Sequence, residues 1–86
     1  MNNENIKLED LHKKDKLWFT RIIPNIDYYG LLEASVVTIN IEEKYCVVTE
    51  KKSKQSFLLN KNEAEQLLFK DKKYALKYLS EQRSKR

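Results

Sequence analysis

The residue types that most often carry chemistry are few in this sequence and widely separated. His12 is the single histidine and Cys46 the single cysteine, so neither has a His or Cys partner at the spacing that a metal site needs. His12 lies beside Lys13 and Lys14 in a polar segment, which favours a solvated side chain. Cys46 lies among apolar residues of a predicted strand, which favours a small core residue over a nucleophile. The sequence therefore predicts no metal site.

The acidic residues and the glycine do not point to catalysis either. Glu9 and Asp10 are neighbours, as are Glu42 and Glu43, and neighbouring side chains of an extended chain point to opposite faces. Gly30 is the only glycine, so the sequence contains no glycine-rich phosphate loop. We therefore expect a non-enzymatic protein with no cofactor and no small-molecule substrate.

Length and composition predict one domain that covers residues 1–86. Hydrophobic residues make up 41% and charged residues 35%, with Gly and Pro present once each, as in an ordinary small globular chain. No apolar run approaches the roughly 18 residues of a membrane span, and the start MNNENIKLED does not resemble a secretory signal. We expect a cytoplasmic protein with no membrane partner.

A lead-in segment, residues 1–14, precedes a first strand that is rich in aromatic and β-branched residues. This strand, Lys16–Ile23, ends at Pro24, and residues 24–30 have the Pro, Asn, Asp and Gly of a loop. In the second strand, residues 31–41, the apolar positions change parity between Val36 and Val37, which predicts a β-bulge or a bend. The inward residues are expected to be Leu32, Ala34 and Val36 before the bend and Val37, Ile39 and Ile41 after it.

Two more short strands, residues 45–50 and 55–60, continue an antiparallel meander. One helix over residues 61–82 would place the charge of Asp71 on its buried line. We instead expect a helical turn, a short strand at residues 67–69 that closes a barrel, and a helix over residues 71–83. Asp71 caps that helix, and its apolar arc packs over one end of the barrel. This arc contains Tyr74, Ala75, Leu76, Tyr78 and Leu79. The predicted fold class is thus mainly β, with a barrel of about five strands over residues 15–70.

The order of these elements resembles that of small uncharacterised proteins of phages and prophages in Gram-positive bacteria. The resemblance covers about residues 14–82 and includes the phrase F-x-D-x-x-x-A-L, formed by Phe69, Asp71, Ala75 and Leu76. The sequence departs from the pattern of those proteins at Lys14, where a turn glycine is usual. The resemblance implies an SH3-like barrel with a C-terminal helix and a phage or prophage setting. It implies no shared activity.

Two kinds of binding remain open. In the first, an aromatic and apolar surface binds a host or phage protein and modulates it. Aromatic residues are candidates for such a surface because they contribute much of the binding energy of protein interfaces. The candidate residues of this surface are Trp18, Ile26, Tyr28 and Tyr29. A core position for Trp18, and a loop that folds back onto the core, are the alternatives to this exposed surface.

The second kind is nucleic-acid binding, which requires clustered positive charge. The net charge of +4 is concentrated at the C-terminal end, where residues 70–86 hold seven basic and two acidic residues. The candidate residues are Lys51, Lys52 and Lys54 in one turn and Lys72, Lys73, Lys77 and Arg83 near the C-terminus. A basic terminus that only improves solubility is the alternative, and interior acidic residues interrupt the basic face. A protein partner is therefore the first choice.

Overall fold

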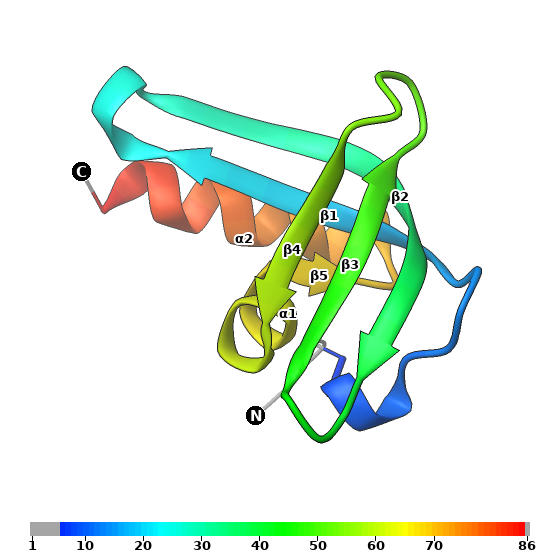
Figure 1. Cartoon of the computed structure of the whole chain (residues 1–86). Helices are drawn as coiled ribbons and strands as arrows, with labels where there is room; N and C mark the ends of the chain where they lie inside the picture. Colours follow the sequence, from blue (N-terminus) through cyan, green and yellow to red (C-terminus); the bar gives the residue numbers. More distant parts are fainter. Residues whose placement is uncertain (1–5, 86) are drawn as a thin grey trace.

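The computed structural model describes residues 6–85, which form one five-stranded antiparallel sheet and two α-helices (Figure 1). The chain order is a 3-10 helix Leu8–Asp10, β1 Lys16–Ile23, a 3-10 helix Pro24–Ile26, β2 Tyr28–Asn40, β3 Tyr45–Glu50, β4 Ser56–Asn60, α1 Lys61–Leu67, β5 Leu68–Phe69 and α2 Lys72–Ser84. The mainly β class and the division of the C-terminal third into helix, strand and helix are confirmed.

The sheet is open, so the predicted closure into a barrel was wrong. The strand order is β4-β3-β2-β1-β5, which makes β4 and β5 the two edges. A capping box starts α1 directly after β4: the side chain of Asn60 accepts from the Glu63 N–H at 2.8 Å, and Glu63 accepts from the Asn60 N–H at 3.1 Å. Because residues 61–67 form this helix, only two residues remain extended in β5, and they pair with β1.

β2 is bent, as its change of parity predicts. The register of β2 against β3 shifts between Val36 and Thr38, which is the position expected for a bulge. The bend turns β3 and β4 across β1 (Figure 1), and Phe57 of β4 meets Phe19 of β1 with ring centroids 5.1 Å apart. Of the residues expected inward after the bend, Ile39 packs on the core, whereas Val37 and Ile41 are each 48% exposed. Val37 is exposed because it is the extra residue of the bulge.

The main core lies between the crossing halves of the sheet. Ile6, Leu8 and Leu11 of the lead-in segment close one side of it; residues 1–5 of that segment lie outside the described part of the chain. The rest of the buried cluster is formed by Leu17, Phe19, Ala34, Val36, Cys46, Val48, Leu59, Ala64 and Leu68. Cys46 is thus a core residue, as expected.

α2 packs on the opposite, outer face of β1 and β2, not over an end of a barrel. Asp71 caps it by accepting from the Lys73 N–H at 3.2 Å, as predicted. Ala75 and Leu79 are buried beneath the helix, and Tyr78 packs against Phe69 with ring centroids 5.5 Å apart. Leu76 of the predicted apolar arc is 49% exposed, because it lies at the side of the helix face that Ala75 and Leu79 bury.

The loop between β1 and β2 is shorter than predicted. Only residues 24–27 turn the chain, with Asp27 in the left-handed region at φ 56°, and β2 starts at Tyr28, which pairs with Ile23. Tyr28 and Tyr29 are therefore strand residues, and as neighbours in a strand they point to opposite faces of the sheet.

Candidate functional site

The outer face of β1 and β2 is the surface on which α2 lies. Residues that pair across antiparallel strands share a face, and the pairs Trp18 with Glu33, Thr20 with Leu31 and Ile22 with Tyr29 follow one another along this face. α2 runs along the β1–β2 hairpin, with its C-terminal end beside the turn (Figure 1). Strand and helix together therefore form the walls of an elongated surface feature.

A groove of about 270 Å³ runs between β2 and α2. Its lining residues are Tyr29, Leu31, Leu76, Leu79, Ser80 and Arg83. The helix residues recur at the three- and four-residue spacing that keeps side chains on one helix face. We call this feature the α2–β2 groove. Its walls are mostly apolar, and its volume suits one or two side chains of a partner.

Two basic residues of α2 lie over aromatic rings of the sheet, one near each end of the helix. Lys72 Nζ is 5.3 Å from the ring centroid of Trp18, and Arg83 Cζ is 5.3 Å from that of Tyr29. Such contacts contribute about 0.5–1 kcal/mol at exposed sites. Neither cation has a carboxylate within salt-bridge distance among residues 6–85. The groove therefore combines a mostly apolar lining with one positive charge, that of Arg83.

The structure brings two of the four predicted protein-binding residues to this outer face and separates the others from it. Tyr29 lines the groove, and Trp18 lies next to it under Lys72. Ile26 is at the tip of the hairpin and 68% exposed. Tyr28 points to the other face, where its ring lies over Gly30. The groove residues Leu31, Leu76, Leu79 and Ser80 were not predicted as site residues. The helical spacing of Leu76, Ser80 and Arg83 was the signal that could have indicated them.

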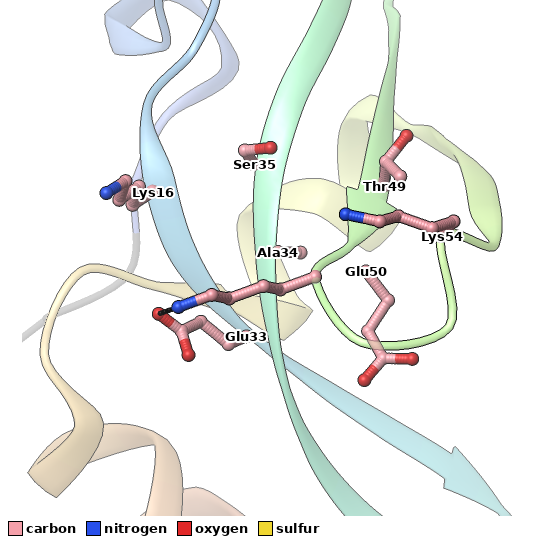
Figure 2. Close-up of a pocket in the computed structure, with 8 residues that line it drawn as sticks. Lys16, Glu33, Ala34, Ser35, Thr49, Glu50 and Lys54 are labelled. Carbon is pink, nitrogen blue, oxygen red and sulfur yellow. Dashed lines mark ion pairs between the residues drawn. The ribbon is translucent and has the colours of Figure 1, made fainter.

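A second hollow, of about 190 Å³, lies where the β3–β4 turn meets β2 (Figure 2). It is lined by Lys16, Glu33, Ala34, Ser35, Thr49, Glu50, Lys51 and Lys54. Lys51 Nζ is 3.8 Å from Glu33 Oε2, and Figure 2 shows Lys54 extending from the turn towards β2. The Glu50 carboxylate accepts from the hydroxyl of Ser53. We call this feature the lysine hollow.

The predicted nucleic-acid residues are divided between these features. Lys51 and Lys54 line the lysine hollow, and Lys52 is exposed in the same turn. Lys72 and Arg83 lie over Trp18 and Tyr29. The remaining two are elsewhere on α2: Lys73 lies over the ring of Tyr74 at 5.8 Å, and Lys77 is exposed.

The single cysteine and the single histidine lie apart, Cys46 in the core and His12 at the surface. Among residues 6–85 no group of three or more His, Cys, Asp or Glu side chains is placed to hold a metal ion. Cys46 is fully buried, and burial raises the pKa of its thiol, which lowers its reactivity. His12 lies at the surface 3.8 Å from Asp15. The α2–β2 groove and the lysine hollow therefore remain as candidate sites, and both suit binding.

No protein-family model, no curated protein and no solved structure matches this chain. Within residues 6–85 no helix is long and apolar enough to cross a membrane. The function is accordingly proposed from the geometry and charge of the two surface features.

Proposed function

We propose that this protein is a non-enzymatic binding module that holds a segment of another protein in the α2–β2 groove. The observation that carries this proposal is Leu76, which is 49% exposed on a helix whose neighbouring apolar residues are covered. Leu76 and Leu31 contribute apolar lining to the groove, and Tyr29 and Arg83 line it as well. Aromatic and arginine side chains next to an apolar pocket are the residues that most often dominate binding energy.

The size of the groove supports a protein partner. Full burial of one leucine or phenylalanine side chain contributes about 1.5–3 kcal/mol, and a groove of about 270 Å³ accepts one or two such side chains. The walls come from a strand and a helix that are fixed by the buried residues Ala75 and Leu79. A partner therefore meets a preformed site, which lowers the entropic cost of binding.

We further propose that the protein acts in the cytoplasm of a bacterial host as a phage or prophage accessory protein that modulates a host or phage protein. The resemblance of residues 14–82 to such proteins supports this setting. The bend of β2, which turns β3 and β4 across β1, supports an SH3-like character even though the sheet is open.

The test is selection of a displayed library of random peptides against the full chain, followed by measurement of the affinity of each selected peptide. Leu76→Asp should abolish binding of most selected peptides, because it removes an apolar side chain from the groove and puts a charge where the apolar residue of the ligand would be buried. Leu58→Asp is the matched control, since Leu58 is 65% exposed on β4, away from the groove. If no peptide is enriched, or if both variants bind alike, the groove is not the binding site.

Nucleic-acid binding is a second candidate function, and the lysine hollow favours it. Lys16 and Lys54 have no carboxylate within salt-bridge distance among residues 6–85, and Ser35 and Thr49 line the same hollow. Labelled single- and double-stranded DNA and RNA should then bind in a way that weakens steeply with salt. Lys54→Glu should weaken this binding and Lys85→Glu, at the C-terminal end, should not. Binding that depends on Lys85 alone would mark the charge as a tail effect.

A further inference from the structure

One stretch of β2 is a free sheet edge. β3 pairs with β2 from Ala34 to Asn40, and β1 pairs with it from Tyr28 to Ser35. Residues 28–33 therefore have a strand on one side only among the described residues, because the bend carries β3 away from the hairpin (Figure 1). Unpaired backbone groups on such an edge are ready to pair with another extended chain.

The hydrogen bonds that flank this stretch show which backbone groups face the free edge. The Val36 N–H donates to the Asp15 carbonyl at 2.9 Å, and the Val36 carbonyl accepts from the Lys14 N–H at 2.8 Å, so Val36 faces the side of β1. The Glu33 carbonyl accepts from the Lys51 N–H at 2.8 Å, on the opposite side. Backbone groups alternate sides along a strand, so Tyr29 and Leu31 direct their N–H and C=O groups to the free edge.

The same two residues line the α2–β2 groove with their side chains. An extended segment that pairs with their backbone would place every second side chain on the outer face, between β2 and α2. The side chain opposite Leu31 would lie near Leu76, and the side chain opposite Tyr29 would lie near Arg83. Backbone bonds and the groove would thus act on the same ligand.

We propose that the partner binds by strand addition to the edge of β2 at Tyr29 and Leu31. This inference rests on the proposed protein-binding function of the groove and specifies the ligand. The segment is extended, with an apolar residue opposite Leu31 and an acidic residue two positions away, opposite Tyr29. Strand addition takes affinity from main-chain hydrogen bonds and specificity from the pockets that receive alternate side chains.

The acidic residue follows from the charge of α2. Arg83 lies over Tyr29 at 5.3 Å and has no carboxylate within salt-bridge distance among residues 6–85, so a ligand carboxylate is its natural partner. The helix holds four basic residues, Lys72, Lys73, Lys77 and Arg83, against Glu81. A second copy of this chain would bring an equally basic helix to the same edge, so the charge favours an acidic segment over self-association.

The experiment uses peptides selected on the full chain and amide hydrogen exchange of the complex. Binding should slow the exchange of the Tyr29 and Leu31 amides, whereas the Gly30 and Leu32 amides, which face β1, are already protected before the peptide is added. Peptides with an N-methyl group at every second residue can be made in two patterns. The pattern that removes the N–H groups facing β2 should abolish binding, and the other pattern should keep it. Selected sequences should share an acidic and an apolar residue two positions apart.

Two variants test the same point from the side of the protein. Leu31→Pro removes an outward N–H, which an edge strand tolerates, and should weaken peptide binding by at least about tenfold relative to Leu31→Ala, which keeps that N–H. Arg83→Glu should reverse the preference for acidic peptides. The N-methylated peptides report on the edge even if the proline variant fails to fold.

The outcomes separate this inference from the function on which it rests. Peptides that depend on Leu76 but neither protect the Tyr29 and Leu31 amides nor respond to N-methylation would overturn strand addition and leave the groove as a protein site. Absence of any peptide that depends on Leu76 would overturn both. A stable dimer that protects these amides without peptide would assign the edge to a second copy, against the inference.

Discussion

Thr20 Oγ1 donates a 2.9 Å hydrogen bond to the carbonyl oxygen of Leu67 and so ties the middle of β1 to the end of α1. Thr20 is fully buried, and its bond satisfies one of the carbonyls that a helix leaves unpaired at its C-terminal end. The contact lies where α1 ends and β5 begins.

Thr20→Val should lower the free energy of unfolding by about 1–2 kcal/mol, because the isosteric side chain leaves this carbonyl without its partner. Urea denaturation measures the change. Thr38→Val, on the outer face of the bent part of β2, is the control and should be close to neutral. Equal stability of the two variants would show that the bond contributes nothing.

The free energy of unfolding should also decrease at acidic pH, because Glu65 becomes protonated. Its carboxylate lies 2.6 Å from Lys61 Nζ and accepts from the Leu8 N–H at 2.9 Å, and these bonds lower the pKa of Glu65 below its ordinary value of 4.5. The unfolded chain then binds the proton more tightly than the folded chain. The contribution is therefore present above the ordinary pKa and is lost as the pH falls through the lower folded pKa.

Glu65→Gln should reduce this pH dependence at pH values below the ordinary pKa of 4.5, by about 1 kcal/mol or less because the pair is partly solvated. Urea denaturation at a series of pH values gives the measurement. Glu43→Gln, in the exposed turn between β2 and β3, should leave the profile unchanged. An identical profile for all three proteins would contradict the assignment to Glu65.

The order of the elements could be predicted because local signals agree with the final packing. The parity change at Val36 and Val37 appears as a bulge, and Asp71 was assigned as a cap because a long helix would bury its charge. Barrel closure was wrong because it depends on how far β4 and β5 lie apart, and no local signal fixes that distance. The exposure of Val37 likewise depends on which residue the bulge leaves out of the pairing.

The candidate site was less accessible from sequence. Tyr29 and Trp18 were predicted because they are large aromatic residues. Tyr28 and Ile26 were predicted on the same ground of size and apolar character, but they lie on the other face of the sheet and at the tip of the hairpin. The groove depends on which face of β2 the helix covers, and this is a tertiary fact. Leu76, Ala75 and Leu79 fall on one apolar arc of the helix, so the sequence pattern assigned all three to the same buried face. The structure buries Ala75 and Leu79 but leaves Leu76 exposed.

Lys14→Gly should stabilise the protein. Lys14 has φ 74°, in the left-handed region that non-glycine residues adopt at a cost, and its N–H bond to the Val36 carbonyl holds it there. Glycine removes this conformational cost, but it also increases the entropy of the unfolded chain, which offsets part of the benefit. The free energy of unfolding should rise by about 0.5–1 kcal/mol. Lys13→Gly is the control in thermal unfolding and should not raise the melting temperature. A lower melting temperature for Lys14→Gly would refute this account.

Gly30→Ala should destabilise the hairpin that carries the groove. The ring of Tyr28 lies over Gly30 so closely that a β-carbon there would collide with it. Displacing this ring should cost about 0.5–1.5 kcal/mol, because the obstructing atoms are the far end of a side chain that is 37% exposed. In a Tyr28→Ala background the same substitution should be nearly neutral, because the obstructing ring is gone. Additive effects of the two changes in a double-mutant cycle would mean that Tyr28 moves aside, and that Gly30 is not needed to seat it.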